Sequence, residues 1–261
     1  MVSVIGIPLD ENSSFLRGPA LAPDKIREAF HSESSNYFSE SGVCLHPSVE
    51  WMDEGNLNLG SGQLAIEQIE QKAKALLIEG NKIFSLGGDH SVSYPLIKAV
   101  SEFHPNLTVI HIDAHPDLYN DFEGNSFSHA SPFSRALEGG HIHRLIQIGI
   151  RTMNAHQREQ ANRFGVEVIE MKNFKDDLKL KIEGSVYLSF DMDAIDPAFA
   201  PGVSHYEPGG LTSRQAIRII QNLQGNLVGA DLVEFNPTRD PSGITAMLAA
   251  KLFKEILERL F

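Results

Sequence analysis

The feature that most constrains this chain is a regular alternation of apolar, strand-like runs with helical patterns along its whole length. Strands are predicted at residues 2–7, 83–86, 107–112, 145–150, 166–169, 186–190 and 227–233, with one more short strand near Val49. Helices are predicted at residues 24–30, 63–79, 94–103, 155–164, 213–223 and 244–260. Strands that alternate with helices favour a parallel sheet covered on both faces. The sequence therefore predicts an α/β fold.

The organisation of the chain indicates one domain over residues 1–261. No linker, internal repeat or low-complexity tract interrupts the alternation, and single α/β domains of this size are common. Hydrophobic residues make up 42% and charged residues 21%, which is ordinary for a soluble globular protein.

Net charge narrows the class of partner. The formal charge of −12 offers no basic surface for nucleic acid or an anionic membrane, and it favours small cationic molecules. Cys44 is the only cysteine, so no intrachain disulfide is possible. The first residues lack the pattern of a signal peptide, and no apolar run approaches the ~20 residues that span a bilayer. We therefore expect a cytoplasmic protein with no membrane or nucleic-acid partner.

A pair of carboxylates follows the predicted strand 186–190. If the strand continued, Asp191 and Asp193 would project from one face, at the carboxyl end where α/β sheets place ligand sites. Neighbouring buried carboxylates repel each other unless a cation or a shared proton compensates them. The alternative is structural, because Asp193 and Asp196 could simply shape a turn before Pro197.

A second group of polar residues follows the predicted strand 107–112. Asp113, His115 and Asp117 alternate and would point one way while the chain stays extended, and Pro116 disfavours helix at the residue before it. Alternatively, Asp113 could cap a helix and His115 could be a hydrogen-bonded core histidine. With His90, at the end of an earlier strand, six oxygen and nitrogen donors are predicted to meet at one edge of the sheet.

The donor set predicts two metal ions. Six ligands exceed what one tetrahedral zinc uses, but bridging carboxylates allow them to serve two ions roughly 3.5–4 Å apart. Carboxylates with two imidazoles and no thiolate favour manganese over zinc or copper. Such a site would accept a cationic carbon centre.

Three motifs in this order resemble those of the ureohydrolase family, the arginases and agmatinases. They are Gly-Gly-Asp-His-Ser at 87–91, Asp-Ala-His-Pro-Asp at 113–117 and Ser-Phe-Asp-Met-Asp-Ala-Ile-Asp-Pro at 189–197, followed by Ala-Pro-Gly at 200–202. The resemblance implies a three-layer αβα domain with an eight-stranded parallel sheet and two Mn²⁺ ions. It implies that one ion is held by His90, Asp113, Asp117 and Asp191. It implies that the other is held by His115, Asp113, Asp191 and Asp193, with Asp113 and Asp191 bridging.

The same resemblance implies the catalytic groups. His129, in Ser-His-Ala at 128–130, resembles the family's proton-shuttling histidine, a role that suits a pKa near neutrality. Glu234 resembles the carboxylate that grips the guanidinium group through paired hydrogen bonds. Asp117 is expected to act in catalysis as well as in metal binding. The implied reaction is attack on the guanidinium carbon by a water that the metal pair activates, with release of urea.

The choice of substrate depends on the rim of the site. Glu-Gly-Asn at 123–125, together with residues 128–131, most resembles the plant-type arginases, and Asn125 offers a neutral donor for a carboxylate. Asn154 occupies the place where animal arginases use an aspartate, so its grip on an α-ammonium should be looser. We expect L-arginine to be preferred, with agmatine or a guanidino acid as the alternative substrate. We also expect a homo-oligomer, a trimer or hexamer as in the family.

Three other functions stay open from the sequence. Phosphoester hydrolysis is disfavoured because no glycine-rich phosphate loop accompanies the motifs and because Asp121 and Glu123 would repel phosphate. Deacylation with one zinc, as in deacetylase-like proteins of the same broad fold, would not need six ligands. A non-catalytic binding protein would not need the full ligand set with His129. His104, His111, His141, His143, His156 and His205 are expected to be structural or exposed.

Overall fold

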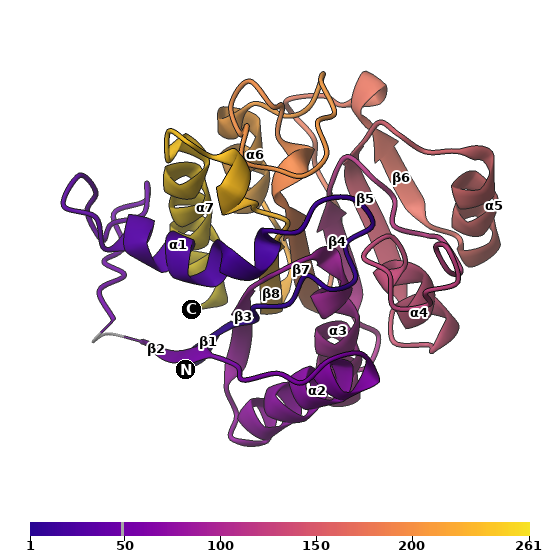
Figure 1. The fold of residues 1–261 in the computed structure, drawn as a ribbon, viewed down its shortest axis with the longest axis horizontal. Coiled ribbons are helices and arrows are strands. Elements are labelled where there is room, and N and C mark those ends of the chain that lie inside the picture. The colour runs from indigo at the N-terminus through magenta and orange to yellow at the C-terminus, as the bar shows by residue number, and fades with distance from the viewer. Residues whose placement is uncertain (48–49) are drawn as a thin grey trace.

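The computed structural model describes residues 1–47 and 50–261, which form one eight-stranded parallel sheet between two layers of helices (Figure 1). The strand order is β2-β1-β3-β8-β7-β4-β5-β6. The strands are β1 Val2–Gly6, β2 Trp51–Asn56, β3 Lys82–Leu86, β4 Thr108–Ile112, β5 Arg144–Ile150, β6 Glu167–Glu170, β7 Ser185–Asp191 and β8 Asn226–Val233. The predicted three-layer α/β fold with an eight-stranded parallel sheet is confirmed.

The helices divide between the two faces of this sheet. They are α1 Ala22–Phe30, α2 Gln63–Ile78, α3 Ser93–Phe103, α4 Pro132–Glu138, α5 Ala155–Phe164, α6 Ser213–Gln221 and α7 Ile244–Leu260. Buried side chains of α1, α6 and α7 pack with one face, and those of α2, α3, α4 and α5 pack with the other. Within β4, Ile110 and Ile112 join the first core and Val109 joins the second. This alternation explains why the central strands are apolar throughout.

Most predicted elements appear within two residues of their predicted ends, with two differences. Val49, near which a short strand was predicted, lies outside the described residues, and the observed strand β2 begins at Trp51. Helix α4 was not predicted, because its seven residues are too few to show a helical period. Pro132 stands in its first turn, where proline's fixed φ suits a helix start.

The sheet order brings the chemically important segments together. The central neighbours β3, β8, β7 and β4 are parallel, so their carboxyl ends meet at one edge. The segments that follow them begin near Gly87, Glu234, Asp191 and Asp113. Ligand sites of open α/β sheets lie at this edge. No helix among residues 1–47 and 50–261 combines the length and apolar character needed to cross a membrane.

Candidate active site

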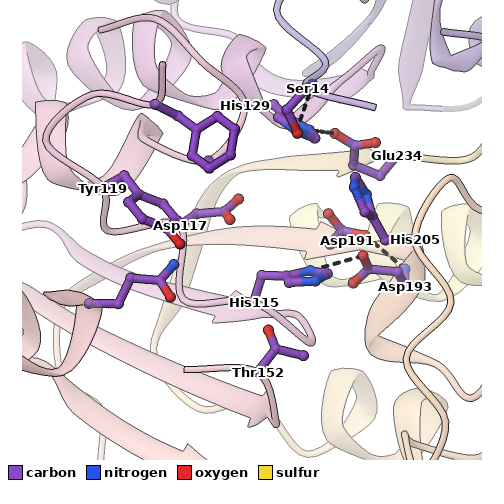
Figure 2. Close-up of a pocket in the computed structure, with 13 residues that line it drawn as sticks. Ser14, His115, Asp117, Tyr119, His129, Thr152, Asp191, Asp193, His205 and Glu234 are labelled. Atoms are coloured by element: carbon purple, nitrogen blue, oxygen red, sulfur yellow. Dashed lines mark hydrogen bonds and ion pairs between the residues drawn. The ribbon is translucent and has the colours of Figure 1, made fainter. Parts of the chain in front are cut away.

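A cavity of about 180 Å³ opens at the carboxyl edge of the sheet (Figure 2). Its lining includes six predicted site residues, which are His115, Asp117, His129, Asp191, Asp193 and Glu234. Tyr119, Phe122, Thr152 and Gln157 also line it, as do Ser14, Ala130 and His205. The cavity is therefore strongly acidic in one part and neutral in another.

The first group of donors surrounds His90. Its Nδ1 lies 3.2 Å from Asp113 Oδ2, 3.0 Å from Asp117 Oδ2 and 3.1 Å from Asp191 Oδ2. All four side chains are buried. The structure thus brings together the four residues that were predicted to hold one ion.

The second group surrounds His115. Its Nδ1 lies 3.1 Å from Asp193 Oδ2 and 3.4 Å from Asp113 Oδ1. Asp113 therefore faces His90 with one oxygen and His115 with the other, which is the arrangement of a bridging carboxylate. Asp191 faces His90 with Oδ2, while its Oδ1 accepts a hydrogen bond from the backbone of Asp193.

Hydrogen bonds around His90 show that a cation suits this place. Ser189 Oγ donates to Asp231 Oδ1 at 2.7 Å, so it accepts from His90 Nε2, which lies 2.9 Å away. The proton on Nε2 leaves a lone pair on Nδ1, and this buried atom has no hydrogen-bond partner. Lone pairs of nitrogen and of three carboxylates then face one another, an arrangement that a cation or a shared proton relieves. The donors fit a divalent ion such as manganese.

Electrostatics support the same reading. Burial, then the negative charges of Asp193 and Asp113, raise the pKa of Asp191 well above its usual range. Carboxylates packed this closely resist ionisation until positive charge compensates them. The site therefore gains most from a ligand of high positive charge.

The local backbone differs from the predicted extended conformation. Strand β7 ends at Asp191, and Asp193 lies in a 3-10 turn formed by Met192–Ala194. Strand β4 ends at Ile112, and Asp117 adopts a left-handed conformation with φ of 49°. The donors converge because the chain turns around the site, and the prediction of strand alternation was wrong in this respect.

His129 and Glu234 form a buried pair beside the donors. His129 Nδ1 lies 2.7 Å from Glu234 Oε1, which also accepts from the backbone N–H of His90. Glu234 Oε2 is buried without a hydrogen-bond partner. On the other side of the ring, His129 Nε2 meets the backbone N–H of Ser14 at 3.1 Å and its hydroxyl at 2.8 Å. Ser14 can therefore donate to the neutral ring through its amide or accept from the charged ring through its hydroxyl.

The pKa of His129 reflects this environment. Burial alone would lower it, but the charge and hydrogen bond of Glu234, with the charges of Asp89 and Asp117, raise the pKa to about 9. The ring can thus hold a proton close to the cavity at neutral pH. A group of this kind suits the delivery of a proton to a leaving amine.

The two asparagines predicted at the rim make hydrogen bonds with neighbouring residues. Asn125 is exposed, and its side chain accepts from the backbone of Phe127 and donates to Asn12. Asn154 caps helix α5 and donates to the hydroxyl of Tyr119. Neither is among the residues that line the cavity. Their caps and turns occupy the polar atoms that were expected to face substrate.

Other residues reach the site without having been predicted. His111 is buried and lies 2.6 Å from Asp113 Oδ2, so it orients that carboxylate. His205 lines the cavity, and burial and the nearby imidazole of His129 lower its pKa. Ser14 comes from the loop after β1, which the sequence shows only as a polar segment. Lone histidines and loop serines have no spacing signal that separates them from solvated residues.

Comparison with known proteins agrees with the site. The model of the arginase family matches residues 1–258. The chain is 47% identical to Arginase 1, mitochondrial, of Arabidopsis thaliana, over 99% of this chain and 80% of the relative. It superposes on the arginase of Medicago truncatula with a TM-score of 0.93 at 41% identity, covering 99% and 87% of the two chains. The chain also superposes on the agmatine ureohydrolase of Thermoplasma volcanium with a TM-score of 0.88 at 32% identity, covering 99% and 89% of the two chains. The chain therefore belongs to the arginase family.

Proposed function

We propose that this protein hydrolyses L-arginine to L-ornithine and urea, with two divalent ions, preferably manganese, bound in the cavity. One observation carries the proposal. Two His/Asp clusters that share Asp113 border the same cavity as Glu234, and Oε2 of Glu234 has no hydrogen-bond partner. His90, Asp117 and Asp191 would complete one metal site, and His115 and Asp193 the other. Bound there, the ions would supply a water of lowered pKa.

The residues of the chain account for the remaining chemistry. Glu234 Oε2 can accept the N–H groups of a guanidinium, and the charged hydrogen bonds gain strength because the carboxylate is buried. When the His129 ring is charged, its Nε2 proton can be donated to the Ser14 hydroxyl or passed to the departing amine. Once that proton has left, the backbone N–H of Ser14 can donate to Nε2. Asp117 Oδ2 lies 3.0 Å from His90 Nδ1, so this carboxylate would serve the metal site from the cavity wall.

The distribution of charge in the cavity supports arginine over agmatine. Away from the carboxylates the wall is formed by Tyr119, Thr152 and Gln157, which are neutral and polar. A neutral wall suits the zwitterionic end of arginine better than a second isolated cation. We propose that Asn125 and Asn154 act on the substrate indirectly. Asn125 would shape the loop 118–128 and Asn154 the start of α5, and both segments border this wall. Agmatine is the second candidate, since an agmatine ureohydrolase shares the fold.

A parallel measurement of kcat/KM on the manganese-loaded protein tests the substrate. Arginine, agmatine and 4-guanidinobutyrate should all be assayed for urea. We expect arginine to lead by about 10-fold or more, which is only ~1.4 kcal/mol of differential transition-state binding. Agmatine leading by that margin would replace the proposed substrate, and urea from none of the three would refute hydrolysis.

Metal content, assembly and location complete the proposal. Elemental analysis should find two divalent ions per chain, and a single tightly bound zinc would contradict the site. We propose a homo-oligomer, a trimer or hexamer, which light scattering tests. We also propose a cytoplasmic location. The Arabidopsis thaliana relative is named as mitochondrial, so fractionation of the native cells is the direct measurement.

A further inference from the structure

One histidine that the proposed reaction does not use enters the cavity beside its most acidic part. His205 lies in the segment between the 3-10 turn Met192–Ala194 and α6, and Figure 2 shows its ring between Glu234 and Asp193. Its ring centroid is 5.6 Å from that of His115 and 5.6 Å from that of His129. The ring therefore lies between one predicted metal ligand and the proton-bearing histidine.

The backbone on both sides of His205 is held firmly. Before it, Ser204 Oγ accepts a hydrogen bond from Asn236 Nδ2 at 2.9 Å. After it, the carbonyl of Glu207 accepts from Arg151 Nε at 2.8 Å and from Nη2 at 2.6 Å. Arg151 Nη2 also donates to the carbonyl of Asp193 at 2.7 Å. These contacts tie the segment to the chain that carries Asp193, so His205 is presented in a fixed place.

The ring nitrogens of His205 are available to a ligand. Among residues 1–47 and 50–261, neither nitrogen makes a hydrogen bond, although the ring is half-buried. Its other neighbour is the ring of Phe15, 5.5 Å away, which offers no hydrogen-bonding atom. A neutral imidazole has one donor and one acceptor, whereas a guanidinium has only donors. The free acceptor of His205 thus complements the same group that the unpaired Glu234 Oε2 attracts.

We propose that His205 contacts the guanidinium group of the substrate beside Glu234 and restricts the site to guanidines whose terminal nitrogens carry no alkyl substituent. The proposal rests on the proposed function for its substrate class. The expected hydrogen bond to the guanidinium follows from the free ring nitrogens of His205. The expected exclusion of a bulkier group follows from the position of the ring between Glu234 and Asp193. The histidine would act by contact with substrate, in addition to the residues already assigned.

Three substitutions separate these two effects. His205→Phe keeps the bulk of the ring and removes its acceptor, so KM for arginine should rise about 10-fold or more, because one hydrogen bond to the charged guanidinium is lost. His205→Ala removes both the acceptor and the bulk of the ring, so it should show the same rise in KM. It should also reduce the preference of the enzyme for arginine over Nω-methylarginine. His205→Asn restores an acceptor on a smaller side chain and should recover part of the KM. In all three, kcat should change less than KM.

A binding measurement removes the dependence on turnover. Guanidinium chloride, titrated into the manganese-loaded protein by calorimetry, should bind more weakly to His205→Phe than to wild type, by about 10-fold. His143→Phe is the matched control, because His143 is exposed near the start of β5, at the opposite edge of the sheet. That control should bind guanidinium as wild type does.

The outcomes distinguish this inference from the proposed function. If wild type releases no urea from any guanidine, the proposed function fails, and guanidinium binding still tests the contact. Unchanged KM and unchanged guanidinium binding in His205→Phe would overturn the contact. A loss of manganese from His205→Phe would overturn it too, because His205 would then support the metal site. An unchanged preference against the methylated substrate in His205→Ala would overturn the steric role.

Discussion

The substitution Glu234→Gln changes one charge in the cavity and little else. The glutamine carbonyl can accept the two hydrogen bonds that Glu234 Oε1 now accepts, from the backbone of His90 and from His129 Nδ1. Both side chains have the same shape, and the left-handed backbone, with φ of 62°, costs glutamine the same as glutamate. The fold should therefore survive, and the measured effect should report the lost charge.

The structure allows two estimates of the free energy lost with the charge of Glu234. A rise in the pKa of His129 from 6.5 to about 9 corresponds to roughly 3 kcal/mol in favour of the imidazolium, and Glu234 is the main cause of the rise. Removing one partner of a buried charged pair costs about 2–5 kcal/mol, so kcat/KM for arginine should fall by roughly 30- to 5000-fold. Both effects act on the same reaction and need not add.

The pH dependence has a definite sign. Because the folded pKa of His129 is raised, its contribution to stability is complete below pH 6.5 and is lost as the pH rises through about 9. Glu234→Gln should lower that pKa, so the ring should lose its proton at a lower pH than in wild type. Histidine NMR titration and the pH profile of kcat/KM measure this shift.

A control and a refuting result complete the test. Glu123→Gln removes a carboxylate from the exposed loop and should leave kcat/KM within a few-fold of wild type. Both variants should retain manganese, since Glu234 is not among the predicted ligands. A Glu234→Gln enzyme with wild-type kcat/KM and an unchanged His129 titration would refute the assigned role of this carboxylate.

Three further results are expected. His129→Asn should lower kcat by roughly 10²–10⁴-fold while elemental analysis finds the metals retained, because it removes only the proton carrier. Asp113→Asn should lower the content of both metal ions, since Asp113 faces both histidines of the site; loss of one ion alone would contradict its shared role. Hydrogen bonds from neighbouring side chains overcome burial and lower the pKa of Glu255, so its stabilisation is present above about pH 4.5 and is lost on acidification. Urea unfolding at pH 7 and pH 3 should show a smaller acid effect in Glu255→Gln.

The local sequence pattern was sufficient to predict most helices and strands and to identify the carboxylates and imidazoles as candidate ligands. Apolar runs with intervening helical periods predicted the strands because both faces of a parallel sheet are buried. The polar residues at 113–117 and 191–193 stood out because carboxylates and imidazoles directly after such strands have few structural uses. The short helix α4, at Pro132–Glu138, was missed because it has too few residues for periodicity to appear.

The order of the strands, which places His90, Asp113 and Asp191 around common points, depends on the tertiary structure. The sequence by itself determined that carboxylates and imidazoles stand at or just after the ends of buried strands. Only the tertiary structure decided that Asp193 approaches through a turn, that Ser14 meets His129 across 115 residues of chain, and that His205 enters the cavity. The reason is physical: hydrogen-bonding capacity and helix or strand preference belong to a residue and its neighbours in sequence. Distance and burial depend on how remote segments pack.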